Sequence, residues 1–566
     1  MQELHLTRIL KSLGQGSVCA VQDGQQLTET HRYLHVERPI QQRLKSLMES
    51  VDEEGGGIIL LIGSAGDGKS HLISCMKESS NWPDRCFYND ATASCSPLKT
   101  AVETLKEALT DFSDEYIDTT RRKLILAINL GKLNAFAEDE EASNRYARLI
   151  AAVRPILDNK ASKNEEGRIK LLDCSEEQIF ELYPSRSSDC RLESHFLSAL
   201  IEKIASPTRN NPFYAAYQKD LESGDESIAK HPVIINYRLL QLPCIRVTLI
   251  KSIIEAIIRC RLRITPREFL DFVREILICP DLDNYLEKED LVKALLPSLL
   301  YSGGNNTIIK AFSKLDPLKE SSIEHDRLLS VLYTSEEIPE DHLSASLKNS
   351  IPKELLDLFR SLFYKERTGE SRTALVRCVF RLEHLLNYHS NSSTYCDYID
   401  LLCNLASGEK KRISAAFQEL EELVQHSLAG NAGSYYSGDN IVPLNIRGEK
   451  YQLFAEIDFG LKDTGFRYDA EHPGIISTEF SLFWKVEQHE KEPVPALKMD
   501  YRLFEYLKEL RKGHLAVAYE NKKDLFFDRF VRNLARFSQR ERKVTIIRYD
   551  GTKTELSQKQ YKLRLK

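Results

Sequence analysis

Apolar residues in the first half of the chain form short continuous runs that alternate with stretches of helical spacing. The runs "IILLI" at 58–62, "LILAIN" ending at Asn129 and "IKLLD" ending at Asp173 have the length and apolar character of buried strands. "DRCFYNDATAS" predicts a strand that ends at Asp90, and "HPVIINYRLL" predicts another. Helical patterns such as "PLKTAVETLKEALTDF" lie between them. This alternation predicts an α/β core with a five-stranded sheet of parallel type over about residues 56–245.

The pattern becomes helical after residue 245. "TPREFLDFVREILI" opens on Thr265 as an N-cap with Pro266 in the first turn, so we expect residues 246–280 to form a helical lid. Helical spacing continues through a helical domain at 281–430 until "AGNAGSYYSGDN" interrupts it. The runs "YQLFAEIDFGL" and "EFSLFWKV", with a hairpin around Asp550-Gly551, then predict a β-rich α+β domain at 431–566.

The first apolar run leads directly into a glycine-rich loop. "GSAGDGKS" meets the phosphate-binding pattern G-x-x-x-x-G-K-[ST], which predicts a P-loop NTPase core. Small residues let backbone N–H groups face a phosphate, and the following helix adds its positive end. Lys69 would reach the β- and γ-phosphates of ATP, and the Ser70 hydroxyl would bind Mg²⁺. The predicted cofactor-binding residues are Gly63, Ser64, Ala65, Gly66, Asp67, Gly68, Lys69, Ser70 and His71.

A glycine-rich turn with a chance lysine is the competing interpretation, and the order of strand, loop and helix disfavours it. Asp67 is unusual, because an acidic side chain in an anion cradle has to point outward, toward a basic partner or solvent. Pro39 begins a predicted helix after "YLHVERPI", so we expect residues 1–55 to form a segment that flanks the nucleotide. Arg246 and Arg267 of the lid could contact a γ-phosphate, although solvated helix arginines are more common.

The carboxylate that an ATPase needs is missing from its usual place. P-loop proteins that hydrolyse nucleotide commonly end a buried strand in Asp, whereas this strand ends in Asn129, whose amide cannot accept a proton. Asp90 and Asp173 are the alternatives, although each could equally be a loop or cap residue. We therefore predict Lys69, Asp90 and Asn129 as catalytic residues, with slow hydrolysis by the isolated chain.

Composition indicates a soluble multidomain protein. The chain has 566 residues, 42% of them hydrophobic and 29% charged, with a net charge of −6, so its overall charge does not argue for nucleic acid. The start, "MQELHLTRILKSLGQG", lacks an apolar core of signal-peptide length. Apolar runs all stay well short of the ~18 residues of a membrane span. We expect a cytoplasmic protein with no membrane partner.

The 12 cysteines include no C-x-x-C pair, so neither a disulfide framework nor a zinc ribbon is indicated. One group deserves weighing as a metal site, because it combines two histidines with two cysteines. Its spacings place the four side chains on different helical faces, which favours ordinary helix residues over zinc. The group is His384, His389, Cys396 and Cys403.

The end of the chain is basic. Residues 498–566 contain 19 Lys and Arg against 9 Asp and Glu. Within them, "DLFFDRFVRNLARFSQR" predicts an amphipathic helix with Phe526, Phe530, Leu534 and Phe537 packed inward. The opposite face is either a solvated surface or a contact for DNA phosphates or an acidic subunit. That face carries Arg529, Arg532, Arg536 and Arg540.

Several stretches in order resemble the DptF (DndF) family of DNA phosphorothioation-dependent restriction proteins. They are "YLHVERPI", "GSAGDGKSHL", "YNDATAS", "LAINLGKLNAF", "NPFYAAY", "TPREFLDFVREIL" and "LLPSLLY" followed by "KLDPLKESS". Together they run from about residue 30 to 325, with a fainter likeness in the β-rich end. The chain departs from the family pattern at Ser94, where the family has an acidic residue.

The resemblance implies an ATPase subunit of a bacterial restriction complex. Such a subunit would act with DptG-like and DptH-like partners on DNA that lacks phosphorothioate marks. The family's nucleotide-binding positions fall on Gly63, Gly66, Gly68, Lys69 and Ser70.

Two other functions compete with this one. A signalling NTPase could gate assembly through its nucleotide state without touching DNA, whereas a small-molecule kinase is disfavoured by the more than 280 residues that follow the core and lid. The nuclease itself is not expected in this chain. "PDLDNYLEKED" offers Asp281 and Glu287 but no E-x-K pair on a strand, and a divalent-metal nuclease site needs carboxylates that converge with a lysine.

Overall fold

Contacts divide the computed structural model into two compact units. Unit 1 comprises Met1–Phe180 and Ser194–His389, and unit 2 comprises Glu181–Glu193 and Ser390–Lys566. The structure describes residues 3–19, 29–64, 66–89, 100–157, 165–174, 176–184, 191–222, 224–280, 282, 291–320, 322–365, 369–387, 392–431, 441–448, 451–486, 494, 496–513, 524–537, 543–548, 552–559 and 562–565.

Unit 1 contains a five-stranded sheet with the order β2-β3-β1-β5-β4. Four strands run parallel, and β4 is antiparallel at the edge. Ile62 at the end of β1 pairs with Ile128 of β3 and Asp173 of β5, so these three strands end at the same edge. The α/β class is therefore confirmed. The strands are β1 (Gly57–Ile62), β2 (Phe87–Tyr88), β3 (Lys123–Ile128), β4 (Glu165–Glu166) and β5 (Ile169–Asp173).

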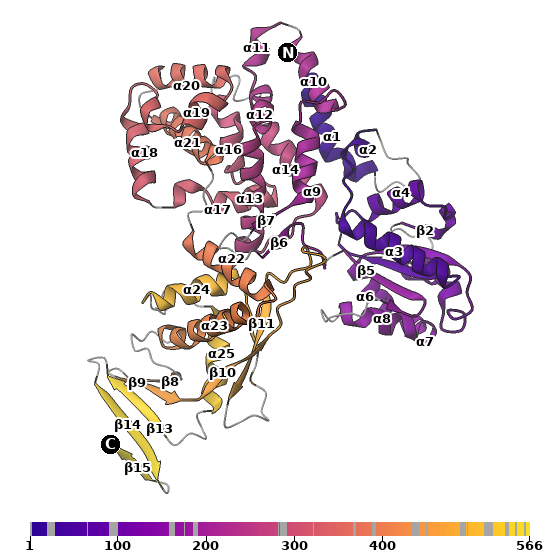
Figure 1. Cartoon of the computed structure of the whole chain (residues 1–566), viewed down its shortest axis with the longest axis vertical. Coiled ribbons are helices and arrows are strands. Elements are labelled where there is room, and N and C mark those ends of the chain that lie inside the picture. The colour runs from indigo at the N-terminus through magenta and orange to yellow at the C-terminus, as the bar shows by residue number, and fades with distance from the viewer. Residues whose placement is uncertain are drawn as a thin grey trace. The chain divides into compact units, whose positions relative to one another are not determined.

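Helices cover both faces of this sheet, as Figure 1 shows. Ile59 and Leu61 of β1 pack with α3 (Pro39–Glu53) and α4 (Lys69–Ser79). Ile58, Leu60 and Ile62 share a second core with α5 (Ala101–Ala108), α6 (Leu130–Glu138) and α8 (Ala147–Leu157). Burial on both faces explains why β1 is apolar at every position instead of alternating.

The prediction of a strand in "HPVIINYRLL" is wrong, because this segment forms helix α12 (Pro232–Leu240). The His231 ring accepts a hydrogen bond from the Val233 amide at 3.3 Å, and Pro232 occupies the first turn. The helix is buried on nearly every side, so its sequence is apolar without a helical period and cannot be told from a buried strand. The sheet therefore ends with β5 and does not extend to residue 245.

The remaining helices of unit 1 follow the sheet or precede it. α14 (Pro266–Leu277) begins at the predicted N-cap Thr265, whose side chain forms a capping box with Glu268. Asn236 of α12 is fully buried, and its carboxamide bonds the Leu277 and Ala294 carbonyls and the Leu296 amide. These bonds tie three segments of the helical region together. The other helices are α1 (His5–Cys19), α2 (Glu29–Leu34), α7 (Glu140–Arg145), α9 (His195–Ala205), α10 (Pro212–Leu221), α11 (Glu226–Ala229), α13 (Pro243–Cys260), α16 (Leu296–Leu300), α17 (Thr307–Lys314), α18 (Ile323–Thr334), α19 (Ala345–Ser350), α20 (Lys353–Lys365) and α21 (Gly369–Leu386).

Unit 2 combines two antiparallel sheets with four helices among its described residues, and its strand-rich character confirms the expected β content. One sheet has the order β10-β11-β12 and the other β15-β14-β13-β9-β8. Strands β13 and β14 pair antiparallel, as the hairpin prediction requires. The elements are α22 (Ser393–Ala406), α23 (Lys410–Asn431), β8 (Ile441–Gly448), β9 (Tyr451–Glu456), β10 (Phe459–Thr464), β11 (Phe480–Val486), β12 (Leu497–Met499), α24 (Tyr501–Arg511), α25 (Leu525–Ala535), β13 (Lys543–Arg548), β14 (Lys553–Lys559) and β15 (Lys562–Leu565).

Unit 2 also includes a two-stranded ribbon, β6 (Glu181–Tyr183) and β7 (Arg191–Glu193), whose sequence interrupts unit 1. The Leu182 amide donates to the Pro473 carbonyl at 3.2 Å, and the Tyr468 hydroxyl donates to the Leu182 carbonyl at 2.9 Å. The contacts also group α22 and α23 with unit 2, whereas the sequence placed a boundary near residue 430. Among the helices that the structure describes, none combines the length and apolar character needed to cross a membrane.

Candidate functional site

The glycine-rich loop connects β1 to α4 at the carboxyl edge of the parallel strands. Gly66 and Gly68 have φ angles of 91° and 87°, which side chains rarely adopt. A Cβ atom at Gly66 would also lie 3.0 Å from the Thr265 hydroxyl. Gly68 is the N-cap of α4 and provides no side-chain cap, so the first turn of the helix relies on other partners for its amide groups.

Lys69 is folded back over the start of the loop. Its ammonium group donates to the Gly63 carbonyl at 3.0 Å and to the Ser64 carbonyl at 2.6 Å. Ser70 follows in the first turn of α4 and is half-buried. The His71 ring lies 2.9 Å from the His35 ring, so it faces that residue. The loop therefore places Lys69 on the cradle itself, with the Ser70 hydroxyl next to it in sequence.

Asp67 is buried, with 5% of its surface exposed. Its carboxylate accepts a hydrogen bond from the Ser64 amide at 2.5 Å, and the Arg263 guanidinium lies 3.4 Å away. The expected basic partner of Asp67 is therefore Arg263. The carboxylate is turned onto the loop, however, where it holds the backbone of the loop together.

Two arginines that the sequence analysis missed contact this loop. Arg38 donates to the Asp67 carbonyl at 2.8 Å and stacks over the Phe196 ring at 5.5 Å, and Arg263 pairs with the Asp67 carboxylate. A signal for Arg38 existed, because it immediately precedes Pro39 in the segment expected to flank the nucleotide. Nothing local marked Arg263.

The lid arginines chosen from sequence occupy other places. Arg246 donates to the Gln241 carbonyl at 2.6 Å and so closes the C-terminal end of α12. This contact gives Arg246 a structural role at the end of α12. Arg267 is exposed in the first turn of α14, beside the Thr265 cap that adjoins Gly66.

Asn129 and Asp173 flank the end of β1 on its two neighbouring strands. Asn129 is the N-cap of α6, and its carboxamide oxygen accepts a hydrogen bond from the Lys132 amide at 2.9 Å. This bond uses one of the two lone pairs of the oxygen and gives Asn129 a structural role at the start of α6. Asp173 is 8% exposed and is the register partner of Ile62, so it lies at the end of the sheet where the loop begins.

The Cys174 thiol is buried next to the loop, where several charged groups influence its pKa. Burial raises the pKa of the Cys174 thiol to about 12. The positive charges of Arg38 and Lys69 lower this pKa, and the negative charges of Asp67 and Asp173 raise it, each by less than burial does. All four charges therefore act on one buried atom beside the loop. Two cations and two carboxylates around a glycine loop suit a ligand that combines a polyanion with a cation.

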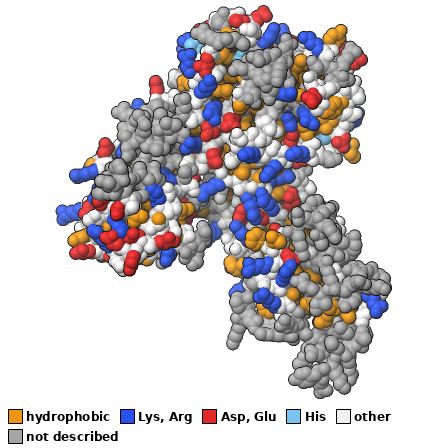
Figure 2. Space-filling view, turned by 180° about the vertical axis from the view of Figure 1, so that it is seen from behind, with side chains coloured by type: hydrophobic (Ala, Val, Ile, Leu, Met, Phe, Trp, Pro, Cys, Tyr) orange, Lys and Arg blue, Asp and Glu red, His pale blue; other side chains and the backbone are white. Residues whose placement is uncertain are grey.

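The basic face in unit 2 lies on α25. Arg529, Arg532 and Arg536 are exposed, and Arg532 pairs with Asp528 at 2.6 Å. Figure 2 shows that Lys and Arg side chains are interspersed with Asp and Glu over the face it draws. Phe530 and Leu534 pack inward as predicted. The inward placement of Phe526 is wrong, because it is 71% exposed and its neighbour Phe527 takes the buried position.

Other sequence expectations fall partly outside the described residues. Cys403 is disulfide-bonded and Cys396 is exposed, and neither belongs to a potential metal-binding group among the residues that the structure describes. Residues named above that lie outside the described ranges are Ala65, Asp90, Ser94, Asp281, Glu287, His389, Arg540, Asp550 and Gly551.

Comparison with known proteins gives no match. No family model, curated protein or solved structure matches this chain. The interpretation of the site therefore depends on its residues and their geometry.

Proposed function

We propose that the chain binds Mg·ATP at the Gly63–Ser70 loop and hydrolyses it slowly. One observation carries the proposal: a glycine loop with left-handed glycines joins a parallel strand to an N-terminally uncapped helix, and Lys69 lies on that loop. Backbone amides and a helix N-terminus together favour a phosphate group. The carboxyl edge of an open parallel sheet is also where ligands of such folds bind.

The residues around the loop have complementary roles in this proposal. Lys69 exchanges its two carbonyl partners for phosphate oxygens, which are stronger acceptors because they are charged. Ser70 and Asp173 supply oxygen ligands of the kind that Mg²⁺ prefers. Arg263, which is half-exposed and loosely paired with Asp67, is the cation best placed to turn toward the terminal phosphate.

Slow hydrolysis follows from Asn129. Its side-chain oxygen caps α6, and an amide is not a general base, so the strand that usually supplies a carboxylate supplies a structural cap instead. Asp173 can support the metal from the other neighbouring strand. Turnover by the isolated chain is then limited by the positioning of water, which a partner or DNA would improve.

The wider role stays a prediction drawn from the sequence resemblance. It is that of an ATPase subunit of a phosphorothioation-dependent restriction complex, with DptG-like and DptH-like partners and DNA. The alternative is a nucleotide-gated assembly NTPase that does not contact DNA. ATP turnover measured with the assembled complex, with and without unmodified DNA, distinguishes the two, because only the first is stimulated by DNA.

The nucleotide site is tested by two serine variants on one helix. Ser70→Ala removes the predicted Mg²⁺ ligand, whereas Ser74→Ala removes a hydroxyl that bonds the Ser70 carbonyl one turn later. Calorimetry with ATP, with and without Mg²⁺, should show that Mg²⁺ strengthens binding to the parent and to Ser74→Ala. In Ser70→Ala this gain should fall by about tenfold, which corresponds to ~1.4 kcal/mol. ATP binding that is undetectable in the parent would refute the proposal.

A further inference from the structure

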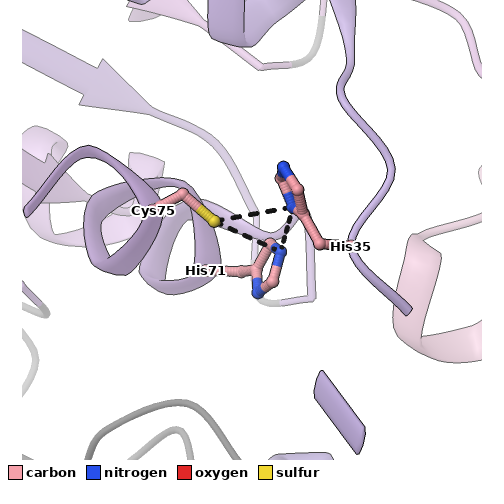
Figure 3. A group of neighbouring side chains, drawn as sticks. All are labelled: His35, His71 and Cys75. Carbon is pink, nitrogen blue, oxygen red and sulfur yellow. Dashed lines mark hydrogen bonds between the residues drawn. The ribbon is translucent and has the colours of Figure 1, made fainter. Parts of the chain in front are cut away.

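Three side chains with metal-binding atoms meet beside α4. His35 lies in the segment between α2 and α3, and His71 and Cys75 are four residues apart on α4. Figure 3 shows the two rings and the sulfur pointing toward one another. His35 Nδ1 lies 2.9 Å from His71 Nε2, and Cys75 Sγ lies 3.5 Å from each of these nitrogens.

These distances match the edges of a tetrahedral metal site. With Zn–N bonds of about 2.05 Å and Zn–S bonds of about 2.3 Å, tetrahedral angles put two nitrogens about 3.3 Å apart and a nitrogen and a sulfur about 3.6 Å apart. The two observed N···S distances of 3.5 Å are slightly shorter than the second value, and the N···N distance of 2.9 Å would have to widen by about 0.4 Å. The geometry is therefore already close to that of the bound state.

Hydrogen bonds among these three side chains cannot all be well formed at the same time. Three contacts join three atoms, but the His35 and His71 nitrogens can share only one proton, and the thiol has one proton for two nitrogens. At most one N–H···N bond and one S–H···N bond are well formed at any moment. One ion at the centre satisfies all three lone pairs at once.

We propose that His35, His71 and Cys75 bind one divalent cation of the Zn²⁺ class. Imidazole and thiolate ligands select zinc and similar metals over Mg²⁺ or Ca²⁺, which prefer oxygen. Three protein ligands leave a fourth position for water or an exogenous group. All three side chains are half-buried, so an ion can enter from solvent.

The ion ties two segments together. It links the stretch before α3 to the first two turns of α4, and Arg38, three residues after His35, donates to the Asp67 carbonyl of the glycine loop. Metal binding therefore fixes the segment that carries Arg38 against the helix that follows the loop. This metal site is independent of whether the loop binds ATP.

The test uses Co²⁺ as a coloured substitute for Zn²⁺ on the full chain under reducing conditions. The expected result is one Co²⁺ per chain, with a thiolate-to-cobalt charge-transfer band and visible bands of tetrahedral intensity, all removed by one equivalent of Zn²⁺. Cys75→Ser should abolish the charge-transfer band. His35→Ala should weaken Co²⁺ binding by more than the ~10- to 100-fold that loss of a supporting outer partner costs.

Cys396→Ser is the matched control, because it removes an exposed cysteine outside the trio and should leave the spectrum unchanged. A band that survives Cys75→Ser, or that disappears in Cys396→Ser, would overturn the assignment. A second measurement guards against misfolded variants: in the parent chain, Zn²⁺ should protect Cys75 from alkylation, as mapped by mass spectrometry. Equal alkylation of Cys75 with and without Zn²⁺ would also refute the site.

Discussion

Replacing Lys69 with alanine tests the proposed phosphate site most directly. In the free protein its ammonium bonds two neutral carbonyls, at 3.0 and 2.6 Å, so nucleotide binding exchanges these contacts for bonds to charged oxygens. Hydrogen bonds to charged groups contribute about 1.5–3 kcal/mol, and in the complex the acceptors carry charge as well as the donor. The net loss in Lys69→Ala is then about 1.5–3 kcal/mol of binding free energy, or about 10- to 150-fold in affinity for ATP.

The loss should depend on the phosphates. Affinity for ATP and ADP should fall, whereas any contact to adenosine alone should be unaffected, since Lys69 lies on the loop carbonyls at the strand end. Lys77→Ala is the control on the same helix, because Lys77 lies about two turns beyond the loop and its ammonium is 6.0 Å from the centre of the Phe87 ring. It should keep the affinity of the parent.

Calorimetry or competition with a fluorescent ATP analogue measures these affinities. The fluorescence of Trp82 reports on the folding of unit 1 when Trp484, the other tryptophan, is replaced by phenylalanine. Equal ATP affinity of Lys69→Ala and the parent, with both folded, would refute the assignment of this loop to phosphate binding. Equal losses in Lys69→Ala and Lys77→Ala would point to a general effect of charge.

Three further variants test other parts of the argument. Asp173→Asn should leave the affinity for ATP without Mg²⁺ unchanged and should reduce the increase in affinity that Mg²⁺ provides by about tenfold or more. If that increase is unchanged, Asp173 is not the carboxylate ligand of Mg²⁺. Asn236→Ala removes the hydrogen-bond partner of two buried carbonyls and one amide, so the free energy of unfolding of unit 1 should fall by about 2–4 kcal/mol in a urea titration. An unchanged unfolding midpoint would contradict the role of these bonds. If the basic face of α25 touches DNA phosphates, the log–log salt slope of DNA binding by the assembled complex should flatten by up to ~3.6 in the quadruple Arg→Gln variant, whereas an unchanged slope leaves the face as surface. That variant changes Arg529, Arg532, Arg536 and Arg540.

Local patterns predicted the elements whose signals are local. The Thr265 cap, the strand before Asn129 and the hairpin near the C-terminus depend on a few adjacent residues, and all three are present. The α12 segment was wrongly predicted as a strand because a helix that is buried on nearly every side lacks a polar stripe. Phe526 and Phe527 are adjacent and point about 100° apart around the helix, so an error in the predicted direction of the buried face assigned the inward position to Phe526 instead of Phe527.

Long-range partners of the site could not be predicted. Arg38 and Arg263 meet Asp67 from 29 and 196 residues away, and only the packing of α3 and of the segment before α14 brings them there. The four-residue spacing of His71 and Cys75 was visible on the predicted helix, but His35 lies 36 residues before His71. A His and a Cys one helical turn apart are common in proteins that bind no metal, so a metal site could be inferred only once His35 was found beside them.

The β6–β7 ribbon is synthesised long before the residues that it contacts. Its Leu182 carbonyl accepts a hydrogen bond from the Tyr468 hydroxyl, which lies 286 residues further along the sequence. At about 5–20 residues per second, the ribosome needs roughly 15–60 s to deliver that partner. During this interval the ribbon lacks its partners from the later part of unit 2, so a short two-stranded edge is open to other chains. Nascent protein, more than the finished molecule, should therefore depend on chaperones at this point.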